Sequence, residues 1–534
     1  MKGSTVYRSI QQRGLHLGLL PQMAAAVNGA TPITLDHDLD ALPHAGRRLT
    51  VAQFADAVDD LAARLWAAGV RPGEHLVVHK SANADIWMLG AAASRIGAIP
   101  VMLSPALDAA TVGALIERVG RPTLLTDTRT LQGPQGRQGL DRLPLAGLTR
   151  RVLIVAGDHP GAQSLAAWAG APRVRPVIRP LDEAAVITHT SGTTGLPKLV
   201  VHTPRTQGIR LVPQWRLLAL MRRKDPVAIH IPFVHSRMVA AMSLALLKEL
   251  PILLLNDSDP HSIAEQFAAH RPGFVEALPN SLMDWEDLAA DPRRPFASVK
   301  IFSSTFDAIH PRTMSRLLNS SERPGALFFQ IYGQSEVGPA VGRAYFRTSA
   351  HKANGRCVGW AMPLGAARVR VVSRDGRPPT QDNPGFIEVA WAGLAKTYFA
   401  EQDRYAANRN GAWWRTGDVG YRTRLGCLHM LDREVDMIEG ITSSLEVEDV
   451  VLGRLPELSE LVVVPGPGDE PVPVICTTDD TPLDPARWRA AVTDFPQLAA
   501  PVQIPQAELP RTATLKVQRL ALADHLHQRR NDPA

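Results

Sequence analysis

The feature that most constrains this fold is a regular alternation of two kinds of segment between Ala45 and about Asn256. Short runs of aliphatic and β-branched residues, bounded by turn-forming residues, alternate with stretches in which apolar residues recur every three or four positions. The short runs read HLVVHK, AIPVML, TLLTD and RVLIVAG, followed further along by VAIHIPF, PILLLN, FVEALP, KIFSST and LFFQIYG. Such alternation predicts an α/β fold of layered sheets whose buried strands are largely parallel.

Two helices can be placed on this pattern. Thr50 is a good helix N-cap residue, apolar residues follow it at helical spacing, and Gly69 suits the end of that helix. The run from Met238 to Leu247 is the longest apolar stretch of the chain. Because it is too short to cross a bilayer, we expect it to form a core helix.

The 534 residues exceed the usual size of one domain several times over. After about residue 360 strand-like pieces separated by Gly, Pro, Asp and Asn turns indicate a more antiparallel region. From Asp432 a helix near LEVEDVVLGRL and strands at LVVVP and VPVIC suggest a smaller α+β unit. We therefore expect a large N-terminal domain over residues 1–431 and a small C-terminal domain over residues 432–534.

The charge and composition of the chain restrict the kinds of partner that it can bind. The net charge is +6, but arginines are scattered among acidic residues without a basic block, which argues against nucleic acid and leaves room for an anionic small substrate. The N-terminal residues lack the apolar core of a signal peptide, and no segment suits a membrane. Cys357, Cys427 and Cys476 lie far apart and suggest neither a disulfide framework nor a metal cluster, so a cytoplasmic location is expected.

The string THTSGTTGLPK, residues 188–198, crowds glycines and hydroxyl residues into one bend that ends in a lysine. Glycines let main-chain amides approach a ligand closely, and hydroxyls with a mobile cation complete a nest for phosphate oxygens. The spacing differs from that of the Walker P-loop, in which lysine directly follows glycine. The string predicts a phosphate-binding loop.

This string resembles the phosphate loop of the adenylate-forming superfamily, which includes acyl-CoA synthetases, peptide-synthetase adenylation domains and luciferases. Five further segments resemble that family's motifs and occur in its order over more than 300 residues. They are IPFVHSR with His235, YGQSE from Tyr332 to Glu336, WRTGD from Trp414 to Asp418, DREVDMI with Arg433, and PRTATLK ending in Lys516. The resemblance implies a large ATP-binding domain and a small mobile C-terminal lid that carries the catalytic lysine.

The resemblance also implies roles for single residues in the attack of an anionic nucleophile on the α-phosphate of ATP. Lys516 would bridge the nucleophile and the phosphate, and Thr194 with Glu336 would hold Mg²⁺. Asp418 would bind the ribose hydroxyls, and Tyr332 would face the adenine. The full expected set of nucleotide-binding residues is Thr190, Ser191, Gly192, Thr193, Thr194, Gly195, Lys198, Tyr332, Gly333, Ser335, Asp418 and Arg433.

On the substrate side the resemblance favours His235, counted both as a catalytic and as a substrate residue. Arg237 is a candidate anion clamp, and Ser304 and Thr305 are expected to line the acid pocket. Amino-acid-activating relatives tend to carry an aspartate where His235 stands, so an amino-acid substrate is disfavoured.

Several departures from the family pattern concern the second half-reaction. The stretch from Arg433 to Glu448 is about three residues shorter than in relatives that use CoA, and Val435 stands at the usual hinge position. Leu199 and Leu515 replace common glycines. SSTFDAIHP, residues 303–311, replaces a small-residue turn beside adenine, so Phe306 and Asp307 suggest a specialised pocket. These departures indicate intact adenylation and question thioester formation, although drift in loops would also explain them.

Three functions remain open. The first is a ligase that activates an aryl or acyl carboxylate as its AMP anhydride, releases pyrophosphate, and transfers the acyl group to a thiol or an amine. The second is an ATP-dependent diazotase of secondary metabolism, which activates nitrite for reaction with an aromatic amine. The third is a non-catalytic ATP-binding regulator, which retention of Glu336, Asp418 and Lys516 together disfavours. The sequence does not identify the acid, the acceptor or the oligomeric state.

Overall fold

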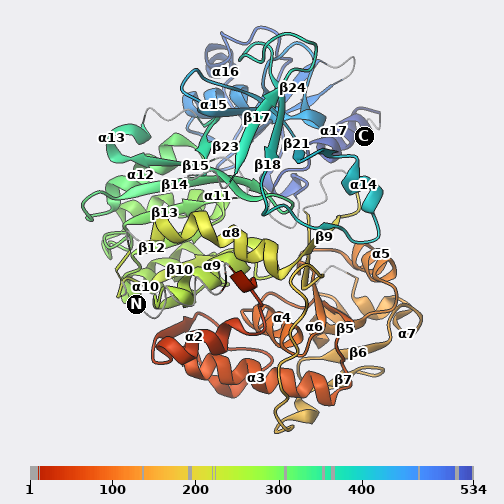
Figure 1. Ribbon diagram of the computed structural model, residues 1–534. Helices are drawn as coiled ribbons and strands as arrows, with labels where there is room; N and C mark the ends of the chain where they lie inside the picture. The colour runs from red at the N-terminus through yellow and green to blue at the C-terminus, as the bar shows by residue number, and fades with distance from the viewer. Residues whose placement is uncertain are drawn as a thin grey trace.

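The computed structural model describes residues 10, 12–134, 138–190, 195–218, 221–222, 224–305, 309–351, 355–362, 367–466, 470–511 and 516–531. Within these residues three sheets of 14, 8 and 3 strands organise the chain (Figure 1). A mixed α/β architecture with largely parallel cores was expected and is confirmed. Among the described helices, none is long and apolar enough to cross a membrane.

The 8-stranded sheet has the order β19-β9-β8-β4-β3-β5-β6-β7. Its strands from β8 to β7 pair in parallel, while β9 and β19 run antiparallel at one edge. The strands are β3 (His75–Val78), β4 (Ile99–Met102), β5 (Thr123–Thr126), β6 (Arg151–Ile154), β7 (Gln163–Ser164), β8 (Val186–His189), β9 (Leu199–His202) and β19 (Thr397–Tyr398). Helices of this region are α2 (Leu20–Asn28), α3 (Val51–Ala67), α4 (Asp85–Arg95), α5 (Ala109–Val119), α6 (Thr128–Gln132) and α7 (Leu145–Leu148).

Helix α3 shows how local sequence sets an element. The Thr50 side chain accepts from the Gln53 main-chain amide and the Gln53 side chain returns a bond to Thr50, forming a capping box. Gly69 has φ +88°, a conformation that suits glycine just past a helix end. Both ends therefore lie where the sequence predicted them.

The 14-stranded sheet has the order β17-β18-β21-β22-β16-β15-β14-β13-β12-β10-β11-β1-β2, with β20 paired to β21. Its parallel part runs from β14 to β1. The strands of this half are β1 (Pro32–Leu35), β2 (Arg48–Thr50), β10 (Val227–His230), β11 (Ile252–Leu254), β12 (Phe274–Ala277), β13 (Ile301–Ser304) and β14 (Leu327–Gln334). Its helices are α8 (Pro204–Leu217), α9 (Ser236–Leu247), α10 (Pro260–His270), α11 (Pro279–Asp284), α12 (Pro311–Ser320) and α13 (Arg347–Ala350).

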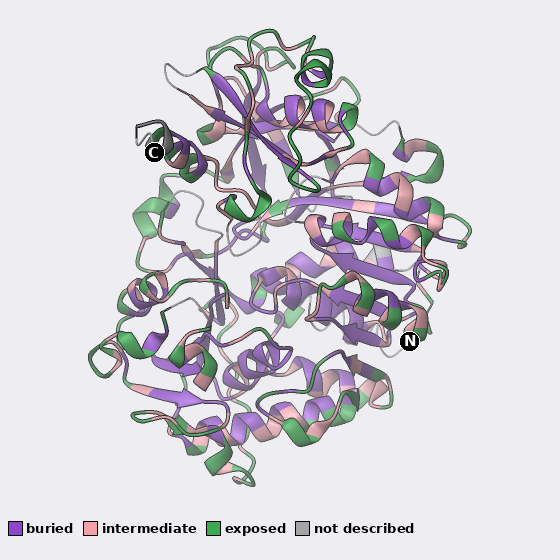
Figure 2. Cartoon of the chain, turned by 180° about the vertical axis from the view of Figure 1, so that it is seen from behind, coloured by how far each residue is buried: buried purple, intermediate pink, exposed green. Residues whose placement is uncertain are grey.

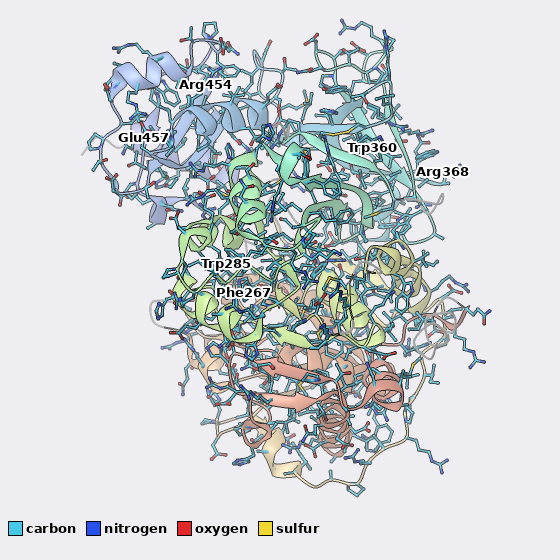
Figure 3. All side chains as sticks on the ribbon, turned by 90° about the vertical axis from the view of Figure 1, so that its left-hand side faces the viewer. Phe267, Trp285, Trp360, Arg368, Arg454 and Glu457 are labelled. Atoms are coloured by element: carbon cyan, nitrogen blue, oxygen red, sulfur yellow. A yellow bond between two sulfur atoms is a disulfide. The ribbon has the colours of Figure 1, made fainter. Side chains whose placement is uncertain are left out.

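Helix α9 contains the long apolar run and is buried along nearly its whole length, so the expected core helix is confirmed. A second core lies around α10 and β12 to β14, where Phe267 meets Trp285 edge-on at 5.9 Å between ring centroids (Figure 3). Strands of both large sheets are buried and their covering helices turn exposed residues outward (Figure 2). These buried strands fix the sheet edge at which the site forms.

The second half of the same sheet is antiparallel, as the change in sequence texture predicted. Its strands are β15 (Gly338–Phe346), β16 (Cys357–Ala361), β17 (Arg368–Val372), β18 (Gly385–Ala390), β20 (Arg409–Asn410), β21 (Trp413–Arg422) and β22 (Leu428–Arg433), with α14 (Gln402–Ala406) beside them. The expectation that the cysteines form no disulfide is wrong for Cys357 and Cys427, which are bonded to each other. They are 70 residues apart in sequence, but β16 and β22 lie next to each other in the sheet.

The C-terminal residues form the 3-stranded sheet of β23 (Leu458–Pro465), β24 (Pro471–Thr477) and β25 (Val502–Gln503). Helices α15 (Ser444–Arg454), α16 (Pro485–Ala491) and α17 (Arg519–Asn531) accompany it at the top of Figure 1. The helix and the two strands predicted after Asp432 are thus present. Two small cores of their own hold this part together, which is consistent with the expected smaller unit.

Candidate functional site

A cavity of about 380 Å³ opens where several parallel strands end. Residues after β4, β8, β10 and β13 reach it, as do β14, β21 and the end of β22. The carboxyl ends of parallel strands are the usual place for ligands in α/β sheets. The cavity gathers the following residues expected from sequence: Thr190, Gly195, Lys198, His235, Arg237, Thr305, Gly333, Ser335, Glu336, Arg433 and Lys516.

The remaining predicted residues fall into two groups. Ser191, Gly192, Thr193 and Thr194 lie outside the described residues, as do Phe306 and Asp307. Ser304 is fully buried at the end of β13, and Tyr332 and Asp418 are buried beside the cavity. The structure therefore brings the six motifs together around one space.

The two ends of the loop predicted to bind phosphate, Thr190 and Lys198, are hydrogen-bonded to each other. The Thr190 amide donates to the Lys198 carbonyl at 3.0 Å, and the Lys198 amide donates to the Thr190 hydroxyl at 3.1 Å. The Lys198 ammonium lies over the Tyr398 ring, 5.2 Å from its centroid. Burial lowers the pKa of Lys198 from its ordinary value. A desolvated lysine at the end of the loop suits an anionic ligand.

Glu336 lines the same cavity and is held by both its main chain and its side chain. Arg210 donates to the Glu336 carbonyl at 2.8 Å, and the Tyr398 hydroxyl donates to Glu336 Oε1 at 2.6 Å. Burial and the neighbouring carboxylate raise the pKa of Tyr398, so this hydroxyl remains a donor. A buried carboxylate oriented in this way provides oxygen ligands of the kind Mg²⁺ prefers.

Asp418 on β21 is the centre of a second cluster. Its Oδ2 accepts from the Tyr332 hydroxyl at 2.5 Å and from Gln334 Nε2 at 3.1 Å, while Arg433 Nε lies 3.8 Å from Oδ1. Asp418 and Arg433 face each other directly across β21 and β22. Burial raises the pKa of Asp418, and the Arg433 charge opposes that shift. The Asp418 carboxylate of this cluster is a charged acceptor of the kind that binds hydroxyl groups.

His235 is the N-cap residue of α9, and its hydrogen bonds define its tautomer. The Arg237 amide donates to His235 Nδ1 at 3.0 Å, so the proton of the neutral ring is on Nε2, which lies 3.4 Å from the Ser335 hydroxyl. Burial, reinforced by nearby cationic groups, lowers the pKa of His235 to about 3. His235 is therefore a neutral donor at ordinary pH and no proton reservoir.

Arg237 is engaged beneath the cavity. Its guanidinium makes a two-pronged contact with the buried Glu276 carboxylate and a further contact with Gln214 on α8. A paired guanidinium offers less charge to a substrate anion than a solvent-facing one. The anion-clamp role of Arg237 stays a prediction.

The segment that joins β22 to α15 is short. Residues 434–443 are all described, and none of them lies in a strand; only the turn η6 (Glu434–Asp436) is regular. Ser444 donates from its amide and its hydroxyl to the Asp432 carboxylate at 2.8 and 2.6 Å, and Ser443 donates to the Leu431 carbonyl at 2.7 Å. Helix α15 thus starts directly against the strand that carries Arg433.

Some residues of the site were not singled out from the sequence. They include Ser104, His189, Gln207, Arg210, Gln334, Tyr398 and Trp414. On α8, Gln207, Arg210 and Gln214 are all buried polar residues at spacings of three and four. Polar residues with that spacing share one face of a helix, so this pattern could have indicated a polar inner face.

Comparisons with known proteins agree with this geometry. The family model described as AMP-binding enzyme matches residues 25–399. The chain is 45% identical to a 3-amino-2-hydroxy-4-methoxybenzoate diazotase of Streptomyces cremeus, over 97% of this chain and 96% of the relative. It is 28% identical to a 3-aminoavenalumate diazotase of a Streptomyces species, over 78% of this chain and 74% of the relative.

Solved structures share the fold. The o-succinylbenzoate CoA synthetase of Bacillus subtilis, in complex with its acyl-adenylate intermediate, superposes with a TM-score of 0.76 at 20% identity, covering 94% of this chain and 97% of that one. The amide bond synthetase McbA of Marinactinospora thermotolerans superposes with a TM-score of 0.73 at 21% identity, covering 96% and 99%. With the family model matching well over half of its length, this chain belongs to the AMP-binding enzyme family and is an adenylate-forming ligase.

Proposed function

We propose that this chain is an ATP-dependent diazotase, which activates nitrite as its AMP anhydride and delivers the nitrosyl group to an aromatic amine. The observation that carries the proposal is the 45% identity to a diazotase along 97% of the chain. The short connection between β22 and α15 supports it, because the family's CoA-dependent members use a longer loop there to line the pantetheine tunnel. An inorganic acid and a small amine need no such tunnel.

In the first step a nitrite oxygen attacks the α-phosphorus of ATP, a new phosphorus–oxygen bond forms, and the bond to pyrophosphate breaks. Lys516, which lines the cavity, would bridge the two anions as they approach. His235 would donate from Nε2 to a ligand oxygen without changing its charge. Positioning and charge stabilisation supply most of the rate enhancement in such a displacement.

The nucleotide would be held by the clusters around it. Residues 190–197 and Lys198 would hold the β- and γ-phosphates. Tyr332 would face adenine, and the Asp418 cluster would bind ribose. The buried Glu336 carboxylate offers an oxygen ligand that suits Mg²⁺, Thr194 would be the second by the family resemblance, and the ion would neutralise phosphate charge when bound. The Tyr398 hydroxyl would keep Glu336 oriented toward it.

In the second step the amine nitrogen attacks the nitrosyl nitrogen and the nitrogen–oxygen bond to AMP breaks. AMP leaves with the oxygen that came from nitrite. The N-nitroso product loses a proton, tautomerises to the diazohydroxide and, on protonation, releases water to give the diazonium ion. A carboxylate ligase would differ already in the first nucleophile, and in its second step the acceptor would attack a carbonyl carbon, so the two functions can be separated at the first step.

Pyrophosphate release from Mg-ATP tests the proposal. We expect release that depends on nitrite, diazonium formation when an arylamine is added, and no effect of CoA. Release driven by aryl or fatty acids, with a thioester forming only when CoA is present, would show that the chain is an ordinary acyl-CoA ligase. The Lys516→Ala variant, which we expect not to form the adenylate, serves as the negative control.

A further inference from the structure

Two cysteines and a histidine meet on one face of the 14-stranded sheet, and none of the three lines the cavity described above. Cys357 on β16 pairs directly with His429 on β22, and Cys427 precedes His429 by two residues. Because side chains alternate along a strand, Cys427 and His429 share one face, with Cys357 opposite them. One ligand atom of each residue, a sulfur or a ring nitrogen, lies within 4.8 Å of the other two. Trp360, labelled in Figure 3, is on the same strand as Cys357.

These three residues lie where two parts of the sheet join. In the strand order, β22 and β16 connect β17, β18 and β21 to the rest of the sheet. Within the described residues this ladder pairs only Cys357 with His429 and Gly359 with Leu428, and the register shifts between the two pairs. A short ladder with an irregularity is a weak junction, so a cross-link reinforces it. The disulfide between Cys357 and Cys427 is such a cross-link.

The disulfide accounts for the two sulfur atoms and leaves the histidine unexplained. His429 Nδ1 is buried and has no hydrogen-bond partner within the described part of the chain. The ring stacks on Tyr421 with 4.7 Å between the ring centroids, which restricts its orientation. Buried polar atoms in proteins are nearly always paired, because leaving one unpaired is unfavourable. An unpaired imidazole nitrogen beside two sulfur atoms therefore indicates a further binding partner.

We propose that the reduced protein binds Zn²⁺ through the thiolates of Cys357 and Cys427 and the ring of His429, with water as the fourth ligand. Zn²⁺ prefers sulfur and imidazole ligands, which stand about 3.5–3.8 Å apart in a tetrahedral site. The three ligand atoms reach that spacing once the sulfur–sulfur bond opens and the cysteine side chains rotate.

The exchange between the two forms needs a thiol reductant, such as the small thiols of a reducing cell interior. Two thiol molecules reduce the disulfide to two cysteine thiols and become a disulfide themselves. Zn²⁺ then displaces the two thiol protons, and the two thiolates balance its charge. The ion holds β16 against β22 in the reduced protein, as the disulfide does in the oxidised one. This site is independent of the proposed diazotase function.

Titration of the reduced full-length protein with Co²⁺, a spectroscopic substitute for Zn²⁺, tests the site. The third cysteine of the chain, Cys476, is buried on β24 in the C-terminal part. In a Cys476→Ser background, a sulfur-to-cobalt charge-transfer band in the near ultraviolet can therefore come only from Cys357 and Cys427. After anaerobic reduction and removal of the reductant, we expect this band to saturate at a stoichiometric amount of Co²⁺ and to disappear when Zn²⁺ is added. The oxidised protein should show no band.

Substitutions and melting temperatures complete the test. In the same background, Cys427→Ser should abolish the band, and His429→Gln should weaken Zn²⁺ binding at least about 10-fold, since losing even a group that orients a ligand typically costs that much. Zn²⁺ should raise the melting temperature of reduced wild type and leave that of oxidised wild type unchanged.

The comparison of reduced and oxidised wild type needs no substitution, so it decides the question whether or not every variant folds. Reduced protein that binds neither Co²⁺ nor Zn²⁺ would overturn the proposal. A band that persists in Cys427→Ser, or Zn²⁺ affinity that His429→Gln leaves unchanged, would overturn it as well.

Discussion

At the scale of single residues, the site depends on which groups are kept neutral and which are kept charged. His235 is neutral because the Arg237 amide occupies Nδ1 and burial opposes a second proton. Tyr398 is neutral because burial and the Glu336 carboxylate oppose its ionisation. Both are therefore available as hydrogen-bond donors across the working pH range, which is what the proposed stabilisation of charge at the α-phosphate needs.

Replacing His235 by asparagine should separate its two functions. Asparagine is a good N-cap and can accept from the Arg237 amide, so α9 should stay intact and the melting temperature should change little. Its shorter side chain does not reach as far as Nε2, so pyrophosphate release should fall by about 10- to 100-fold, an effect expected for one lost transition-state donor.

The pH profile checks the same assignment. With a pKa of about 3, His235 stays neutral as pH falls from 8 to 5. The pH profile of kcat for wild type should therefore show no titration step between pH 5 and 8 that disappears in His235→Asn. For stability, the sign follows from the lowered pKa. The contribution of neutral His235 is present above the unfolded pKa near 6.5 and is lost as pH falls toward about 3. A limb near pH 6.5 that vanishes in His235→Asn would contradict the assignment.

Tyr398→Phe should affect the metal more than the substrate. The change removes the hydroxyl that donates to Glu336 at 2.6 Å and keeps the ring beneath Lys198. Losing such an orienting bond typically lowers metal affinity or activity about 10- to 100-fold. We expect the Mg²⁺ concentration for half-maximal rate to rise and activity to recover at high Mg²⁺. Unchanged Mg²⁺ dependence would show that Tyr398 does not orient a metal ligand.

At the scale of elements, the connection between β22 and α15 is the most informative feature. Ser443 and Ser444 bond to Leu431 and Asp432, so the start of the helix is tied to the strand that bears Arg433. Arg356, also buried, reinforces the same region by pairing with Asp449 on α15 at 2.8 Å. The start of α15 is therefore held against β22 by the Asp432 carboxylate.

Asp432→Asn should change the pH dependence of stability. Burial raises the pKa of Asp432 to about 6, so its stabilising protonated form is fully present below the unfolded pKa and is lost as pH rises through about 6. Asparagine keeps an acceptor for the Ser444 amide and a donor for its hydroxyl, without the buried charge. The variant should gain up to about 3 kcal/mol relative to wild type between pH 4 and 8. The prediction is contradicted if thermal melts give the same difference in stability between Asp432→Asn and wild type at pH 4 and at pH 8.

Sequence alone predicted the elements well, because strand and helix periodicity is local. The ends of α3 follow from Thr50 and Gly69, and the antiparallel half follows from its turn residues. What the sequence missed depends on contacts between distant segments. The Cys357–Cys427 bond requires β16 and β22 to be neighbours, and the contact of Tyr398 with Glu336 requires an edge strand to reach the cavity. No local pattern encodes either one.

At the scale of the whole molecule, six motifs spread over more than 300 residues converge on one cavity from different sources: the ends of parallel strands, the antiparallel strands β21 and β22, and the segment that carries Lys516. Lys516, from the C-terminal part of the chain, lines the cavity together with residues of the two large sheets. In the proposed function, nucleotide binding and chemistry would therefore be supplied by different parts of the chain. Under that division, one substitution is expected to remove the reaction and preserve nucleotide binding.

Lys516→Ala should lower adenylate formation about 1,000-fold, the size expected for losing a contact made mainly in the transition state. ATP affinity, measured by calorimetry, should change only a few-fold, because the phosphate loop and the Asp418 cluster remain. A fall in ATP affinity as large as the fall in rate would show that Lys516 holds the ground state instead.

The most direct test of nitrite activation follows oxygen. Wild type is given nitrite labelled with ¹⁸O in both positions, together with Mg-ATP and an aminoarenecarboxylate, and the AMP is examined by mass spectrometry. Attack by nitrite on the α-phosphorus, followed by cleavage of the nitrogen–oxygen bond, leaves one ¹⁸O atom in every AMP formed. AMP that carries no label, with pyrophosphate released only when an organic acid is added, would show that the chain activates a carboxylate and not nitrite.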